Sequence, residues 1–76
     1  MGITATREDG IITLTLADGT TTTRRGKLAS EYTHVIVRTY ERTVPNINFA
    51  KSRSVLVKYL DDDRATTIEM VAIVDA

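Results

Sequence analysis

One segment, GIITLTLADGTTTTRRG at residues 10–26, constrains the fold more than any other part of this chain. Apolar side chains alternate with threonines along its first half, at Ile12, Leu14 and Leu16. A period of two is typical of a strand with one buried face. Asp18 and Gly19 predict a type I′ turn, because glycine enters positive φ without a steric penalty. Thr20–Thr23 then return as a polar strand, so we expect an antiparallel hairpin whose second strand is exposed or lies at an edge.

The segment YTHVIVRTY, residues 32–40, predicts a further strand with two different faces. One face carries Thr33, Val35, Val37 and Thr39, and the other carries Tyr32, His34, Ile36, Arg38 and Tyr40. The sequence leaves open which face is buried. If a helix covers the threonine and valine face, the tyrosine and arginine face is free to bind. If the helix covers the other face, the stretch is mostly core.

The next segment, VPNINFA at residues 44–50, predicts another strand. Pro45 belongs at its beginning or at an edge, because proline has no N–H to donate to a sheet. Residues 53–62 are ambiguous between helix and strand. A helix would align Val55, Leu56, Tyr59 and Leu60 in one stripe, with Ser52 or Ser54 as its cap. A strand would alternate Val55, Val57 and Tyr59 and end in a hairpin loop at DDDRA.

Residues 66–76, TTIEMVAIVDA, predict the final strand. Both of its faces are rich in apolar side chains, with Ile68 and Met70 on one and Val71 and Ile73 on the other, so we expect a central position in the sheet. The predicted order is β-β-β-β-α-β in a single domain, residues 1–76. This is an α+β fold with a mainly antiparallel sheet of four to five strands and one helix that covers one face of it.

The chain has 76 residues and no cysteine. A domain of this size buries only about 60% of the surface that its unfolded chain exposes, so we expect a thin core. Disulfides and thiolate metal sites are excluded, which suits a reducing cytoplasm. No apolar run approaches the length of a membrane span, so no membrane partner is expected. We expect a cytoplasmic protein that gains stability by forming a homodimer.

Charge is distributed unevenly along the chain although the formal net charge is zero. Residues 1–23 sum to −2, residues 24–58 to +6 and residues 59–76 to −4. A neutral total argues against a protein that binds nucleic acid by charge alone. The basic middle and the acidic end are either a solvated surface or a field that steers a charged partner.

No set of residues for catalysis or metal binding emerges from the sequence. His34 is the only histidine, and no serine lies in a nucleophile elbow. Asp61–Asp63 lack the alternating spacing and the glycine of a calcium loop, and the isolated glycines form no phosphate-binding loop. We therefore predict a protein that is not an enzyme and that uses no cofactor or metal. If His34 has a role, a pH-sensitive contact is the expected one.

Two groups of residues are candidate binding surfaces. Along the tyrosine and arginine face, aromatic and cationic groups recur at every second residue, about 7 Å apart, and Tyr and Arg dominate the energetics of many protein interfaces. The predicted partner-binding residues are Tyr32, His34, Arg38, Tyr40 and Arg42. A second group, the predicted basic patch, consists of Arg24, Arg25, Lys27, Lys51 and Arg53. The alternative is that the tyrosines cover the edge of the core while the arginines reach water.

The segment RRGKLASEYTHVIVRTYER, followed by SRSVLVKYL and TIEMVAIVDA, resembles small uncharacterised proteins encoded by bacteriophages of actinobacteria. Those proteins have an Arg-rich approach to a YTHVVV-like strand, matched here by Tyr32–Val37, then a short helix opened by a serine and a closing strand rich in Val, Ile and Glu. The chain departs from that pattern between Tyr40 and Lys51, where no Trp appears. The resemblance implies a phage accessory protein and favours the helix at residues 53–62. It carries over no functional residue.

The leading hypothesis is a small non-enzymatic protein-binding module. Through the resemblance, this becomes a phage accessory protein that binds and inhibits or modulates a host protein, such as a component of a defence system, in the manner of an anti-CRISPR protein. It would act in the cytoplasm of the infected bacterial host. The alternative is an accessory protein that binds nucleic acid through the basic middle of the chain, and a steep dependence of binding on salt would identify it.

Overall fold

Two β-sheets and one short α-helix form the part of the chain that the computed structural model describes, residues 2–76. The strands are β1 (Thr4–Glu8), β2 (Ile11–Thr15), β3 (Thr21–Arg24), β4 (His34–Thr39), β5 (Asn46–Ala50), β6 (Thr67–Ala72) and β7 (Val74–Asp75). The helical segments are η1 (Lys27–Ser30), α1 (Arg53–Leu56) and η2 (Val57–Asp61), of which η1 and η2 are 3₁₀ turns.

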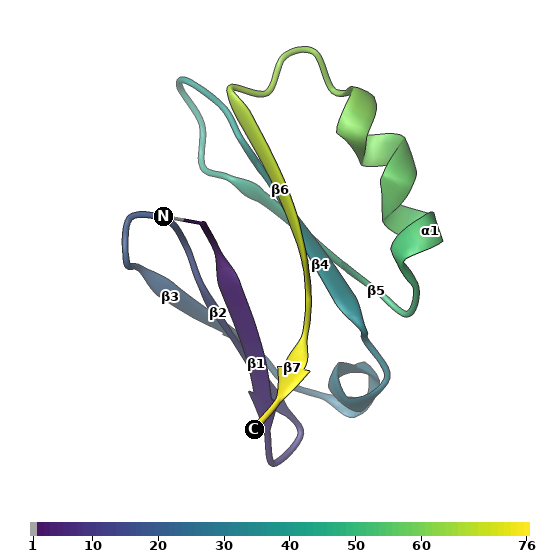
Figure 1. Ribbon diagram of the computed structural model, residues 1–76. Helices are drawn as coiled ribbons and strands as arrows, with labels where there is room; N and C mark the ends of the chain where they lie inside the picture. Colours follow the sequence, from purple (N-terminus) through teal and green to yellow (C-terminus); the bar gives the residue numbers. More distant parts are fainter. Residues whose placement is uncertain (1) are drawn as a thin grey trace.

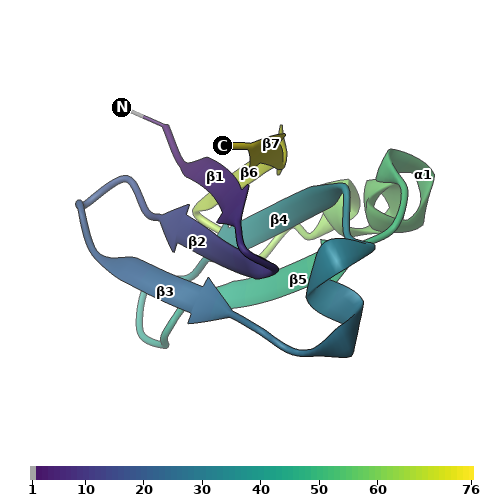
Figure 2. The same cartoon turned by 90° about the horizontal axis from the view of Figure 1, so that it is seen from below.

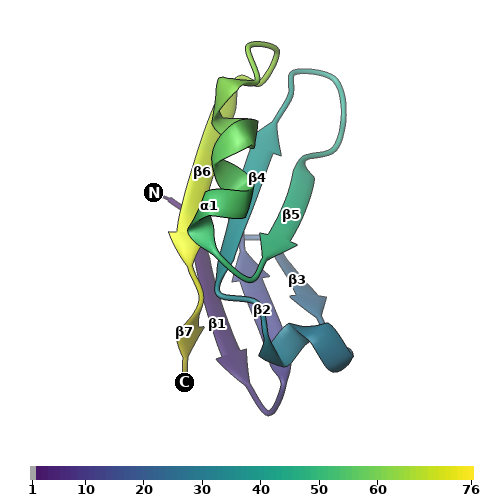
Figure 3. The same ribbon diagram turned by 90° about the vertical axis from the view of Figure 1, so that its right-hand side faces the viewer.

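The elements lie in three layers (Figure 1). The first sheet has the strand order β3-β2-β1-β7, and the second has the order β5-β4-β6. The helix covers the outer face of the second sheet, as Figure 3 shows from the side. All strand pairs are antiparallel except β1 with β7. The predicted α+β class with a mainly antiparallel sheet is confirmed, but two sheets replace the single one expected.

Two Asp-Gly turns shape the first sheet in different ways. The prediction assigned a type I′ turn to Asp18 and Gly19, but there only Gly19 has positive φ, at 90°. The Leu16 oxygen accepts from the Gly19 N–H at 2.9 Å, and Asp18 Oδ1 accepts from the Thr20 N–H at 3.0 Å. The turn with two positive φ angles is Asp9-Gly10, at 53° and 74°. The Asp9-Gly10 turn joins β1 to β2 in a hairpin that the sequence did not predict. This turn is tighter than the one at Asp18-Gly19.

The outer face of the first sheet is a row of threonines. In the register of β1, β2 and β3, six threonines lie opposite one another on this face: Thr4, Thr6, Thr13, Thr15, Thr21 and Thr23. The inner face carries Ala5, Ile12 and Leu14, which are buried. β3 is exposed along its whole length and lies at the edge of the sheet, as its polar sequence predicted.

β4 is buried on both faces. Val35 and Val37 point into the core between the two sheets, whereas Ile36 points to the helix, where it packs with Leu56 and Ala50. The helix therefore covers the face that carries His34, Ile36 and Arg38. Tyr32 lies before the strand begins and packs into the core between the sheets, on the other side from His34.

The last strand lies at an edge of the second sheet, next to β4, and the prediction that it is central was wrong. Both faces of this strand are apolar because each packs against a different core. Ile68 and Met70 pack toward the helix, whereas Val71 and Ile73 pack into the core between the sheets. Ile73 donates its N–H to the Thr33 oxygen at 2.8 Å, and beyond it the chain passes to the first sheet as β7.

Residues 53–61 are helical, which decides the ambiguity left by the sequence. Ser52 is the N-cap residue, but its hydroxyl lies 3.1 Å from the Ser54 hydroxyl and caps no backbone N–H. The buried stripe of the helix contains fewer residues than the sequence pattern indicated. Leu56 is 1% exposed and Tyr59 is half-buried, while Val55 and Leu60 are exposed.

The contact of Leu56 with β4 can be tested by truncation. We expect Leu56→Ala to lower the free energy of unfolding by about 2–5 kcal/mol, because it leaves a cavity between the helix and the sheet. Val55→Ala is the matched control: Val55 is 53% exposed, and a change within about 0.5 kcal/mol is expected there. Urea unfolding followed by circular dichroism measures both. Equal losses in the two variants would contradict this packing.

Candidate partner-binding surface

Arg38 of β4 lies between the sheet and the helical segment. Its Nη1 donates to Asp62 Oδ2 at 3.0 Å, and its Nη2 donates to Asn48 Oδ1 at 3.2 Å. The guanidinium carbon lies 4.4 Å from the centre of the Tyr59 ring, in a cation–π contact. The side chain is 15% exposed. Arg38 therefore joins β4, β5 and the end of η2, and little of it is available to a partner.

Tyr40 belongs to the same cluster. Its hydroxyl donates to Asp62 Oδ2, and the Arg64 N–H donates to Asp62 Oδ1 at 3.1 Å. The Tyr40 hydroxyl, the Arg64 N–H and Arg38 together lower the pKa of Asp62 below its ordinary value, against the effect of its desolvation. The ionised Asp62 thus holds the loop after η2 against the end of β4.

The remaining predicted residues are divided between different parts of the molecule. His34 is half-buried, and its Nδ1 lies 2.8 Å from the Thr33 hydroxyl. Arg42 is exposed in the connection between β4 and β5. Tyr32 lies at the opposite end of β4 from Tyr40 and Arg42. The five predicted partner-binding residues therefore do not form one surface.

An aromatic pair with a cation above it lies at the beginning of β4. The rings of Tyr32 and Phe49 are stacked with their centres 5.5 Å apart and an angle of 25° between their planes. The Arg24 guanidinium carbon lies 5.9 Å from the Tyr32 ring centre and 5.5 Å from that of Phe49. These contacts join the end of β3 to β5, which Figure 2 shows next to each other. Arg24 is exposed, while both rings are half-buried.

Part of the predicted basic patch lies near this pair in the sequence. Arg25 and Lys27 come one and three residues after Arg24 and are exposed, and Lys51 lies two residues beyond Phe49. Lys51 Nζ lies 3.0 Å from Glu31 Oε1, which places it beside the segment that leads to Tyr32. We call this group the aromatic–basic surface; it consists of Arg24, Arg25, Lys27, Tyr32, Phe49 and Lys51. Arg53 is exposed at the first turn of α1, next to this surface in sequence.

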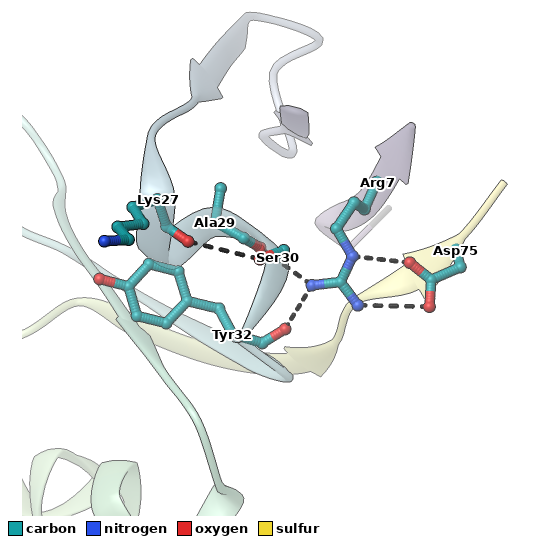
Figure 4. A network of polar contacts seen from close by, with 6 residues as sticks. All are labelled: Arg7, Lys27, Ala29, Ser30, Tyr32 and Asp75. Atoms are coloured by element: carbon teal, nitrogen blue, oxygen red, sulfur yellow. Dashed lines mark hydrogen bonds and ion pairs between the residues drawn. The ribbon is translucent and has the colours of Figure 1, made fainter. Parts of the chain in front are cut away.

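Arg7 holds the segment that carries Tyr32 (Figure 4). Its Nη1 donates to the Ala29 oxygen at 3.0 Å and to the Tyr32 oxygen at 2.6 Å. Its Nε and Nη2 donate to the two carboxylate oxygens of Asp75 at 2.6 and 3.2 Å. One guanidinium thus joins β1, β7, η1 and the approach to β4, in the forked geometry that arginine favours.

Arg7 is not among the candidate residues that the sequence indicates. The signal was its position, because it falls on the same face of β1 as the buried residues Ile3 and Ala5. A cation in such a row requires partners inside the fold. The hydrogen bonds between Arg7 and Asp75 raise the pKa of Arg7 and lower the pKa of Asp75.

Metal binding finds no support in the described residues, 2–76. They contain no group of three or more His, Cys, Asp or Glu side chains that could hold an ion. Within the same residues, no helix is long and apolar enough to cross a membrane. No family model, curated protein or solved structure matched this chain in the comparisons.

The contact between Arg7 and Asp75 predicts a dependence of stability on pH. Because the pKa of Asp75 is lowered by folding, its contribution is present above the ordinary carboxyl pKa and is lost as the pH falls through the lower value of the folded state. We expect Asp75→Asn to be less stable than the wild type at neutral pH and to lose less stability on acidification. Asp63→Asn, at an exposed position, is the control and should follow the wild type. Urea unfolding at a series of pH values measures this, and parallel curves for Asp75→Asn and the wild type would contradict it.

Proposed function

We propose that the protein is a non-enzymatic protein-binding module and that the aromatic–basic surface is its contact with a partner. The observation that carries the proposal is the stacked pair of Tyr32 and Phe49 with the exposed Arg24 above it. Aromatic residues and arginine contribute most of the energy of many interfaces, because they bury large rigid surfaces and bond to carboxylates in a forked geometry.

The backbone and the aromatic rings of the surface are held in place before binding. Arg7 holds the backbone at Ala29 and Tyr32, and the strands β3 and β5 position Arg24 and Phe49. A rigid surface loses little conformational entropy when a partner binds. The surrounding cations favour a partner with an acidic surface. Such a partner would contact Arg24, Arg25 and Lys27 in particular.

The resemblance to proteins of actinobacterial phages indicates what kind of partner to expect. The partner would be a host protein, such as a component of a defence system, which the chain inhibits or modulates. The site of action would be the cytoplasm of the infected bacterium. The chain then acts by covering or distorting its target, which requires neither a catalytic residue nor a cofactor.

Nucleic acid is the second candidate for the same surface. Stackable rings beside several cations are also the elements that bind single strands. The two functions differ in the steepness of their response to salt. Binding to phosphates releases counterions, so it weakens steeply as the salt concentration rises. Nuclease treatment separates them directly, since it removes a nucleic acid and leaves a protein partner in place.

The aromatic–basic surface can be tested by charge reversal. We expect Arg24→Glu to abolish capture of the partner from host lysate by the tagged protein, with or without nuclease, because it places an anion against an acidic partner. Arg42→Glu, in the exposed connection between β4 and β5, is the matched control and should retain capture. Loss with Arg42→Glu alone would place the contact at the other end of β4. Capture that disappears with nuclease would support the nucleic-acid function instead.

A homodimer is also proposed, with the free edge of β3 as the contact. β3 is the outermost strand of its sheet, and its exposed residues Thr21–Thr23 include no proline and no charged side chain that would prevent pairing. A second copy could extend the sheet there by antiparallel pairing about a two-fold axis. The thin core of a 76-residue chain would gain buried surface in this way.

Light scattering tests the dimer at micromolar concentration. We expect a dimer mass for the wild type and a monomer mass for the double substitution Thr21→Lys and Thr23→Lys, because the two edges would then bring like charges together. Thr6→Lys is the control: it lies on the same outer face but in β1, inside the sheet. A monomer mass for the wild type would exclude the dimer.

A further inference from the structure

A cavity of about 340 Å³ opens between the two sheets, at the end of the core where the connection between β2 and β3 meets the approach to β5. It lies at the end of β4 that carries Val37 and Thr39, away from Tyr32. Its size falls within the range of about 300–1,000 Å³ that is usual for ligand sites. Most of its wall is apolar and comes from Ile3, Leu16, Ala17, Val37 and Pro45.

Two carboxylates, Glu69 and Asp18, belong to the wall as well, and no Lys, Arg or His is among its lining residues in the described chain. Glu69 lies in the middle of β6, opposite Val37, and is half-buried. Within residues 2–76, neither carboxylate forms an ion pair. The wall therefore combines apolar surface with negative charge, and a carboxylate beside apolar surface favours a cation that can bond to it.

The backbone fixes the position of Glu69. Its Oε2 accepts from the Ile3 N–H at 3.1 Å. Gly2 lies so close that a Cβ at that position would stand 2.8 Å from the same oxygen. One oxygen is thus held by the N-terminal segment. Asp18 is held in a similar way, since its Oδ1 accepts from the Thr20 N–H and hydroxyl at 3.0 and 2.7 Å.

We propose that this cavity binds a small organic cation, an aliphatic ammonium compound whose hydrocarbon chain fills the apolar wall and whose ammonium group bonds to Glu69. The hydrocarbon chain is favoured by the apolar area that it removes from water. The ammonium group is favoured by a charge-assisted hydrogen bond to a carboxylate. Asp18 adds a second negative charge at the mouth, so an anion of the same shape is disfavoured. The site is separate from the aromatic–basic surface and does not depend on its function.

Three ligands that differ only in the head group test the proposal: hexylamine, hexanol and hexanoate. Each is titrated into ¹⁵N-labelled wild-type protein and followed by amide chemical shifts. We expect hexylamine to give saturable shifts at Ile3, Ala17, Val37 and Glu69. Hexanol should bind more weakly, and hexanoate at least about tenfold more weakly than hexylamine. The absence of saturable shifts at these residues, or equal affinities for the amine and the carboxylate, would overturn the proposal.

Glu69→Gln separates the charge from the shape of the site. Glutamine retains an oxygen for the Ile3 N–H but carries no charge, so we expect hexylamine to lose its advantage over hexanol. Glu41→Gln is the matched control, because Glu41 is exposed and lies outside the cavity wall, and it should retain the wild-type preference. If Glu69→Gln does not fold, Asp18→Asn provides the comparison and should reduce the preference for the amine. An unchanged preference in the folded Glu69 or Asp18 variant would overturn the proposal.

Discussion

The burial of β4 on both faces is the constraint on which the rest of the structure depends. Val35 and Val37 require an apolar cover on one side, and Ile36 requires one on the other. A single sheet with one helix supplies only one of the two covers. The first sheet covers the valine side of β4, and the short helix covers the isoleucine side. This arrangement gives three layers in a chain of 76 residues.

The C-terminal strand holds these layers together. It pairs with β4 as β6, breaks at Ile73, and continues beside β1 as β7. One of its apolar faces packs toward the helix, and the other packs into the core between the sheets. The bonds between Arg7 and Asp75 fix the last residues to the first strand, and the same guanidinium holds the backbone at Tyr32. Arg7 therefore contributes both to the stability of the fold and to the shape of the proposed binding surface.

The two ends of the core between the sheets differ in chemistry. At the beginning of β4, aromatic rings and cations close it, with Arg24 across the gap between β3 and β5. At the other end it stays open as a cavity with apolar walls and two carboxylates. Charges of both signs occur at each end, since Glu31 and Asp75 lie near Tyr32 and Arg38 lies at the other end of β4.

Local pattern determined much of the fold. The alternation in β2 and β4, the polar edge strand β3 and the position of Pro45 before β5 each follow from the period of two and from backbone chemistry, and the structure agrees with all of them. Only the tertiary structure decided which face of β4 the helix covers, because both faces carry enough apolar surface to be buried. It also decided that Arg38 and Tyr40 bond to Asp62, and that Arg24 lies over Tyr32 and Phe49. Such contacts join segments that are distant in sequence, and no local period encodes them.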